Sequence, residues 1–93
     1  MDINGYPTEE EIAKIKQWPN TDFKGLMAFI KEECWWMPDW GWSNRGKTYR
    51  VSTGGWSGNE EIIDALHKND NFFWALCWQS SRRGGHYVFR LYT

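Results

Sequence analysis

Tryptophan is the residue that most constrains what this chain can fold into. Eight tryptophans occur among 93 residues, and four of them fall within the segment Trp35–Trp42. An indole is large and apolar, and its N–H group needs a hydrogen-bond partner when it is buried. A domain of this length has room for about three or four fully buried indoles. The chain must therefore place aromatic side chains on its surface as well as in its core.

Length and composition indicate one folded domain, spanning residues 1–93. Hydrophobic residues make up 41% of the chain, and the aromatic fraction of 18% excludes intrinsic disorder. No apolar run is long enough to span a membrane, and the first residues do not resemble a signal peptide, so we expect a cytoplasmic protein. In that compartment Cys34 and Cys77 are expected to be reduced and buried as small hydrophobic side chains.

Three segments with helical spacing of apolar residues predict helices. A capping box, Thr8-Glu9-Glu10-Glu11, begins the first helix, and Pro19 ends it. The second helix begins near Asn20 or Thr21 and ends before Pro38. Its apolar stripe is the clearest in the chain and consists of Phe23, Leu26, Met27, Ile30 and Cys34. A second capping box, Ser57-Gly58-Asn59-Glu60, begins a third helix that ends before Asn69.

Three further segments predict strands of a small antiparallel sheet. The alternation in Lys47–Thr53 predicts the first strand, and Phe72–Gln79 with His86–Tyr92 predict a hairpin around the turn Ser80–Gly85. Pairing Ser81 with His86 places Cys77 opposite Arg90 and Trp78 opposite Phe89. The predicted fold class is α+β, in the order α-α-β-α-β-β, with the helices on one face of the sheet.

This register divides the sheet into an apolar and a polar face. The apolar face, to be covered by helices, carries Trp74, Leu76, Trp78, Tyr87, Phe89 and Leu91. The polar face carries Gln79, Ser81, His86, Val88, Arg90 and Tyr92, joined by Arg50 and Ser52 from the first strand. A slip of one residue would exchange the two sets.

Charge is distributed unevenly along the chain. Residues 1–39 carry a net charge of −4 and residues 40–93 a net charge of +3. In the second half every acid lies between residues 60 and 70, which leaves six bases in acid-free stretches: Arg45, Lys47, Arg50, Arg82, Arg83 and Arg90. Such a surface indicates an anionic partner, and the alternative is a solvated hairpin edge protected by arginines. The overall net charge of −1 disfavours duplex nucleic acid as that partner.

The glycine-rich segment Ser52–Asn59 leads from a predicted strand into a predicted helix. Such a loop can present backbone N–H groups to an anion, although the alternative is a capped turn with glycines at positive φ. It lacks the ending of a P-loop and the third glycine of a dinucleotide fingerprint. Trp56 or Trp42 is available to stack on a base. The candidate ligand-binding residues are Arg50, Ser52, Trp56, Asn59, Gln79, Ser81, Arg82, Arg83, His86 and Arg90.

The sequence offers little support for catalysis. His67 and His86 belong to no metal-ligand spacing or catalytic triad, and the carboxylates lie on predicted helices away from the basic surface. Neither a metal nor a cofactor is expected. A small enzyme that uses His86 is a third alternative, behind two binding functions.

Three stretches resemble parts of small proteins encoded by bacteriophages and prophages. They are Tyr6-Pro7-Thr8-Glu9-Glu10, the segment Ser52–Glu60 (STGGWSGNE) and the segment Ser80–Tyr87 (SSRRGGHY). The resemblance spans most of the chain but brings no assigned activity with it. It implies a bacterial cytoplasm and a viral accessory role.

Two binding hypotheses follow. In the first, the protein binds, and so sequesters, an anionic nucleotide-like ligand on the basic, Trp-lined sheet face. In the second, it inhibits a host defence protein through a hot-spot patch formed by Trp35, Trp36, Trp40 and Trp42. We expect at least two of these four indoles to stay partly exposed, and an exposed patch also makes a homo-oligomer an alternative.

Overall fold

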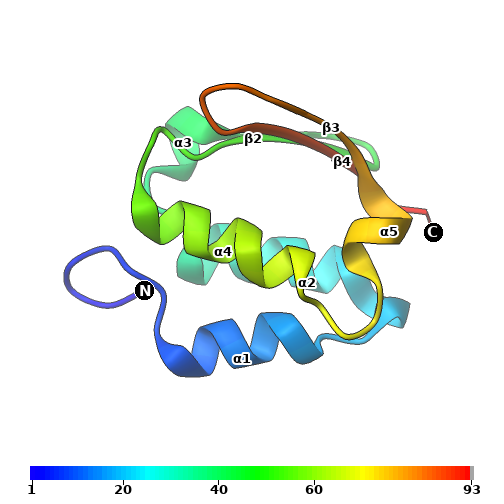
Figure 1. Cartoon of the computed structure of the whole chain (residues 1–93), viewed down its shortest axis with the longest axis horizontal. Coiled ribbons are helices and arrows are strands. Elements are labelled where there is room, and N and C mark those ends of the chain that lie inside the picture. Colours follow the sequence, from blue (N-terminus) through cyan, green and yellow to red (C-terminus); the bar gives the residue numbers. More distant parts are fainter. Residues whose placement is uncertain (93) are drawn as a thin grey trace.

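The computed structural model describes residues 1–92 and shows three layers: a sheet, a pair of helices beneath it, and one helix beneath that pair (Figure 1). The α+β class is confirmed. The predicted order of elements is not matched, because further short elements interrupt it. The order is α1 (Glu9–Gln17), η1 (Asn20–Asp22), α2 (Phe23–Phe29), η2 (Ile30–Cys34), α3 (Pro38–Gly41), β1 (Trp42–Arg45), β2 (Thr48–Ser52), α4 (Ser57–His67), α5 (Phe73–Cys77), β3 (Trp78–Arg82) and β4 (His86–Arg90).

The first two helices follow the sequence prediction closely. In the capping box of α1, the N–H of Glu11 donates to Thr8 Oγ1 (3.1 Å) and the N–H of Thr8 donates to Glu11 Oε1 (2.9 Å). The second helix begins as the 3-10 turn η1, continues as α2 and ends as the π-helical turn η2. All five residues of its predicted stripe are buried, so this stripe is core.

The predicted capping box at Ser57 is wrong. Trp56 occupies the N-cap position of α4 and provides no side-chain hydrogen bond there. The hydroxyl of Ser57 instead lies 2.9 Å from Tyr6 Oη, because the segment before α1 folds back against the start of α4. A long-range contact has therefore replaced the local cap.

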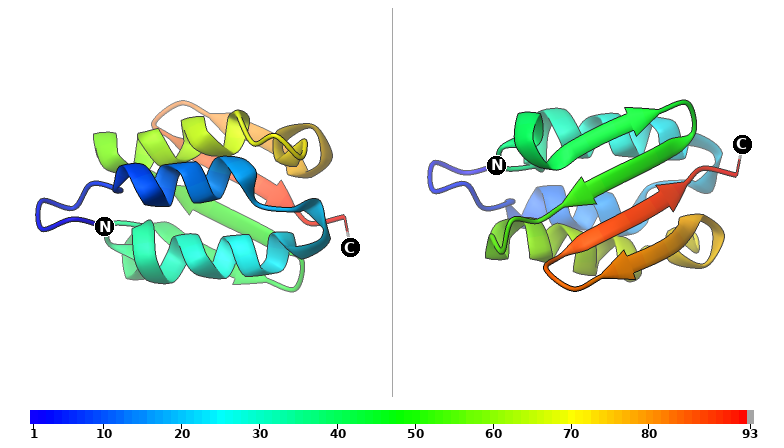
Figure 2. Two further views of the ribbon diagram at one scale, coloured as in Figure 1. Left: turned by 90° about the horizontal axis from the view of Figure 1, so that it is seen from below. Right: turned by 90° about the horizontal axis from the view of Figure 1, so that it is seen from above.

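The sheet is antiparallel, with strand order β1-β2-β4-β3. Helices α2 and α4 cover one face, and α1 packs beneath them (Figure 1). No helix crosses the other face of the sheet in the part of the chain described, as Figure 2 shows in its right-hand view. The prediction of helices on one face is thus confirmed, and the sheet has one uncovered face.

The predicted strand Phe72–Gln79 is wrong over most of its length. Residues Phe73–Cys77 form α5, and the strand runs from Trp78 to Arg82. Phe73 and Cys77 are both buried, at the i, i+4 spacing of a helix. A short apolar run with this spacing fits either a helix or a strand, and contact with the core decides between them.

This change shifts the hairpin register by one residue near the turn. Trp78 still lies opposite Phe89, but an irregularity between Trp78 and Ser80 places Ser81 opposite Tyr87 rather than His86. Such a bulge inserts one residue and exchanges the faces beyond it. Ser80 and Arg82, and not Gln79 and Ser81, therefore pair with Val88 and His86.

The core lies between the sheet and the helices α2 and α4. Aromatic side chains join its layers: Phe73 packs edge-on against both Phe23 and Phe89, with ring centroids 5.0 and 5.3 Å away. Cys34 and Cys77 are free and buried, as predicted. No helix within residues 1–92 has the length and hydropathy needed to cross a bilayer.

Candidate functional site

The uncovered face of the sheet collects side chains from all four strands, and we call this set the basic face. Alternation along β2 places Tyr49 and Val51 in the core and directs their neighbours to the uncovered side. The strand registers then give three rows across the sheet. The rows are Arg82, His86 and Ser52; then Ser80, Val88, Arg50 and Ser43; then Arg90, Thr48 and Arg45.

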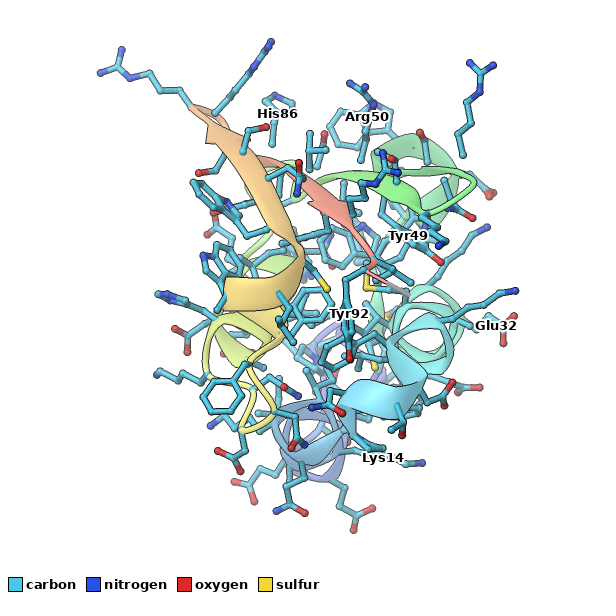
Figure 3. The ribbon with its side chains drawn as sticks, turned by 90° about the vertical axis from the view of Figure 1, so that its right-hand side faces the viewer. Lys14, Glu32, Tyr49, Arg50, His86 and Tyr92 are labelled. Atoms are coloured by element: carbon cyan, nitrogen blue, oxygen red, sulfur yellow. The ribbon has the colours of Figure 1, made fainter. Side chains whose placement is uncertain are left out.

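These three rows contain four arginines and one histidine but no Asp or Glu; the bases are Arg45, Arg50, Arg82, Arg90 and His86. Neighbouring strands are about 4.8 Å apart and alternate residues about 6.8 Å apart, so the bases of adjacent rows lie within side-chain reach of one ligand. Arg50 and His86 project from the side of the sheet opposite the helices (Figure 3). Within residues 1–92, ion pairs form only between the Met1 amino group and Glu11 and between Lys68 and Asp64. The arginines of the basic face therefore have no carboxylate partner in the described chain.

The basic face is hollowed at two places. A hollow of about 500 Å³ is lined by side chains of the first two rows, among them Arg50, Ser52, Ser80, Arg82 and His86. Two of the residues that line it, Ser52 and His86, are joined by a hydrogen bond of 2.7 Å between Ser52 Oγ and His86 Nδ1. A smaller hollow of about 160 Å³ is lined by Ser43, Arg45, Thr48 and Arg50. Arg50 belongs to both hollows and so joins them.

Five of the predicted ligand-binding residues lie together on the basic face, namely Arg50, Ser52, Arg82, His86 and Arg90. Arg83 lies beside it in the turn between β3 and β4. The bulge places Ser81 opposite Tyr87 on the other side of the sheet, and Gln79, the extra residue of the bulge, has no partner on β4. Sequence reasoning missed Ser43, Arg45, Thr48 and Ser80. Arg45 was noted only as a base in an acid-free stretch. No strand was predicted at Trp42–Arg45, because its alternation of side chains is only four residues long.

Asn59 and Trp56 are not part of the basic face. Asn59 is buried, donates to the carbonyl oxygens of Trp36 (3.1 Å) and Thr53 (3.3 Å), and accepts from the N–H of Trp36 (2.9 Å). Trp56 donates from Nε1 to the carbonyl of Gly5 (2.8 Å), and its ring packs between those of Tyr6 and Trp36. The loop Ser52–Asn59 therefore uses these two side chains to fix its own conformation.

The four indoles of Trp35–Trp42 have different environments. Trp35 is buried and Trp42 is half-buried, packing edge-on against Trp35 and Tyr49. Trp36 is 39% exposed and Trp40 is 66% exposed. The prediction that at least two stay partly exposed is confirmed. Trp35 Nε1 is buried without a hydrogen-bond partner among residues 1–92.

A third hollow, of about 210 Å³, lies at the exposed indoles. It is lined by Trp36, Met37, Trp40, Thr53 and Gly54, and we call it the Trp40 hollow. Gly54 has φ +65°, and a Cβ there would lie 3.0 Å from the Trp40 ring, so the indole rests on bare backbone. Gly41 packs so closely on the carbonyl oxygen of Ser52 that a Cβ would clash. These two glycines hold α3 against the end of β2.

Neither cysteine is poised as a nucleophile. Burial, aided by the nearby Glu11 carboxylate, raises the pKa of the Cys34 thiol to about 12. Burial also raises the pKa of the Cys77 thiol to about 11. Because the thiolate is the reactive form, both are inert at neutral pH. In the described part of the chain no three His, Cys, Asp or Glu side chains are grouped as a metal site would require.

No protein-family model, curated protein or solved structure matches this chain. A function therefore has to be inferred from the geometry of the chain's own residues. The resemblance to phage-encoded proteins stays a prediction.

Proposed function

We propose that this protein binds an anionic, phosphate-bearing ligand of nucleotide type on the basic face and leaves it chemically unchanged. The observation that carries the proposal is the gathering of Arg45, Arg50, Arg82, Arg90 and His86 on one uncovered sheet face without an acid. Like charges this close repel one another, and an anion relieves that repulsion.

The donor types on this face fit a phosphate group. An arginine guanidinium offers paired N–H donors whose spacing matches two phosphate oxygens. Ser80 adds a hydroxyl donor inside the 500 Å³ hollow, where the Ser52 hydroxyl is hydrogen-bonded to His86. Since Nδ1 of His86 is engaged with Ser52, its Nε2 is the ring nitrogen left to meet a ligand.

The hydrogen bonding of the Ser52–His86 pair favours binding over catalysis. A serine and a histidine act as nucleophile and base when a third group orients the histidine. Among residues 1–92, only Ser52 hydrogen-bonds the His86 ring. In a bacterial host the consequence of binding without turnover is sequestration of the ligand, the accessory role that the resemblance to phage proteins implies.

Ligand-induced thermal stabilisation tests this proposal. We expect nucleotides or cyclic dinucleotides from a panel to raise the melting temperature of the wild type, because a ligand stabilises the state that binds it. The double variant Arg50→Ala/Arg90→Ala should lose this shift while its ligand-free melting temperature stays within about 5 °C of the wild type, since both side chains are exposed.

The matched control is Lys24→Ala/Lys31→Ala, which removes the same charge from exposed positions on the helical side. It should keep the ligand-induced shift. The proposal is overturned if no anion of the panel stabilises the wild type, or if the control loses the shift as completely as the arginine variant. Chromatography of the recovered ligand should show it chemically unchanged.

The second candidate function is inhibition of a host protein through the Trp-rich segment. The specific observation in its favour is the exposure of Trp40 and Met37, at 66% and 52%. Large exposed indoles are typical anchors of protein interfaces. If this function is the correct one, Trp40→Ala will abolish capture of the host protein and leave every anion-induced thermal shift unchanged.

A further inference from the structure

We infer that the Trp40 hollow is the ring-binding half of the ligand site, so that a single nucleotide places its phosphate on the basic face and stacks its base on Trp40. This inference rests on the proposed function of the basic face. It assigns the stacking role, for which the sequence offered Trp56 or Trp42, to an indole from a different element.

Consecutive residues of the chain line the hollow of about 500 Å³ on the basic face, which we call the anion hollow, and the Trp40 hollow. Ser52 lines the anion hollow, and the next two residues, Thr53 and Gly54, line the Trp40 hollow. The N–H of Thr53 donates to the carbonyl of Gly85 (3.0 Å), which ties this strand end to the β3–β4 turn beside His86. Helix α3, the end of β2 and the β3–β4 turn lie at the same end of the sheet (Figure 2). One small molecule can therefore contact both hollows.

The walls of the Trp40 hollow are held in place before any ligand arrives. Asn59 exchanges two hydrogen bonds with the backbone of Trp36, and the Trp36 ring packs on Trp56 with centroids 4.9 Å apart. The Trp40 ring rests on Gly54 and is otherwise largely open to solvent. A rigid indole with a free face is the arrangement on which nucleobases stack.

Two non-glycine residues among residues 1–92 have a positive φ, and one of them, Met37, lines the Trp40 hollow, while the other, Phe72, precedes α5. Met37 has φ 56°, a conformation that long side chains rarely adopt, and its side chain is 52% exposed. Burial of Met37 therefore does not explain why the strain persists. Strained residues of this kind cluster at ligand clamps, where the surrounding structure fixes them.

Size and composition favour a mononucleotide over a longer strand. The anion hollow and the Trp40 hollow, about 500 and 210 Å³, together fall within the range of small-molecule sites. Sites for single-stranded nucleic acid carry successive aromatic platforms. No Phe, Tyr or Trp side chain occurs in the three rows of the basic face, so the Trp40 hollow offers one indole stacking position next to several phosphate contacts.

Calorimetric titration with matched probes tests the inference. The probes are the four common nucleoside 5′-monophosphates, ribose 5-phosphate, which lacks a base, and adenosine, which lacks a phosphate. We expect at least one nucleotide to bind the wild type about 10-fold or more tightly than ribose 5-phosphate, the gain that stacking of one base provides. Adenosine should bind more weakly than its monophosphate.

The substitution Trp40→Ala should bring nucleotide affinity down to that of ribose 5-phosphate and leave the latter unchanged. Trp40→Phe should restore part of the difference. Phe72→Ala is the matched control, because Phe72 is an aromatic residue of similar exposure (69%) and precedes α5 at the other end of the sheet. Independently of any variant, nucleotides but not ribose 5-phosphate should quench the tryptophan fluorescence of the wild type.

The possible failures can be told apart. Equal binding of nucleotides and ribose 5-phosphate, or a nucleotide preference that survives Trp40→Ala, overturns the inference and leaves the basic face as an anion site. Absence of binding for every phosphorylated probe overturns the inference, and the proposed function falls with it if the panel of nucleotides and cyclic dinucleotides also fails to stabilise the wild type.

Discussion

At the scale of the residue, similar side chains in one short loop have opposite roles. Ser52 and Asn59 both belong to the glycine-rich segment that the sequence marked as ligand-binding. Ser52 opens onto the basic face, whereas Asn59 is 1% exposed and has its amide engaged by three backbone groups. Sequence composition could not separate the two, because the contacts of Asn59 are to Trp36, which lies 23 positions earlier in the chain.

Asn59→Ala should therefore lower stability rather than ligand affinity. The substitution leaves the part-buried N–H and carbonyl groups of Trp36 without a partner, at about 1–3 kcal/mol each, whereas the Thr53 carbonyl still accepts from the N–H of Trp56 (3.1 Å), so we expect a loss of about 2–5 kcal/mol in the free energy of unfolding. Chemical denaturation measures the loss. Asn44→Ala is the control: Asn44 also donates to two carbonyls, those of Gly46 and Thr48, but it is exposed, and its removal should cost less than about 1 kcal/mol. A stability of Asn59→Ala equal to that of Asn44→Ala would contradict the structural role.

At the scale of the element, the prediction succeeded where periodicity was long and failed where it was short. The stripe from Phe23 to Cys34 covers three turns, and its five members are all buried. The run Phe72–Cys77 is too short for periodicity to distinguish helix from strand, and it forms α5. Because this run was predicted as a strand, the bulge in β3 was not predicted. Ser81 was therefore placed on the uncovered face, where the structure has Ser80. Strand β2 was recognised by its alternation, so Arg50 and Ser52 were placed correctly.

The stripe of α2 makes a prediction about stability. Leu26 is fully buried between the sheet and the helical layer, so Leu26→Ala leaves a cavity and should cost about 2–5 kcal/mol of unfolding free energy. Lys24→Ala, at an exposed position of the same helix, should change it by less than about 0.5 kcal/mol. Denaturant midpoints compare the two. An unchanged midpoint for Leu26→Ala would show that α2 contributes little to the core.

At the scale of the whole molecule, a nearly neutral chain is built as two oppositely charged sides. The first turn of α1, in the layer farthest from the sheet, is acidic, with Glu9, Glu10 and Glu11. A hollow of about 620 Å³ between α1 and α4 is lined by Glu9, Glu61, Asp64 and Asp70 as well as Lys16. The charge asymmetry was visible in the sequence. Its separation onto two faces was not, because that depends on the layer order.

This separation predicts how the protein meets an anionic surface. If the net charge of −1 governed binding, the protein would not be retained on a phosphate-bearing resin. The basic face offers a local positive field that a net charge does not describe, so we expect retention on phosphocellulose at neutral pH and low salt, with release as salt screens the contact. Arg50→Ala/Arg90→Ala should elute at clearly lower salt than the wild type. Lys24→Ala/Lys31→Ala changes the net charge equally but leaves the basic face intact, so it should elute with the wild type. Equal early elution of the two double variants would mean that net charge, and not the arrangement of arginines on the uncovered sheet, governs contact with phosphate.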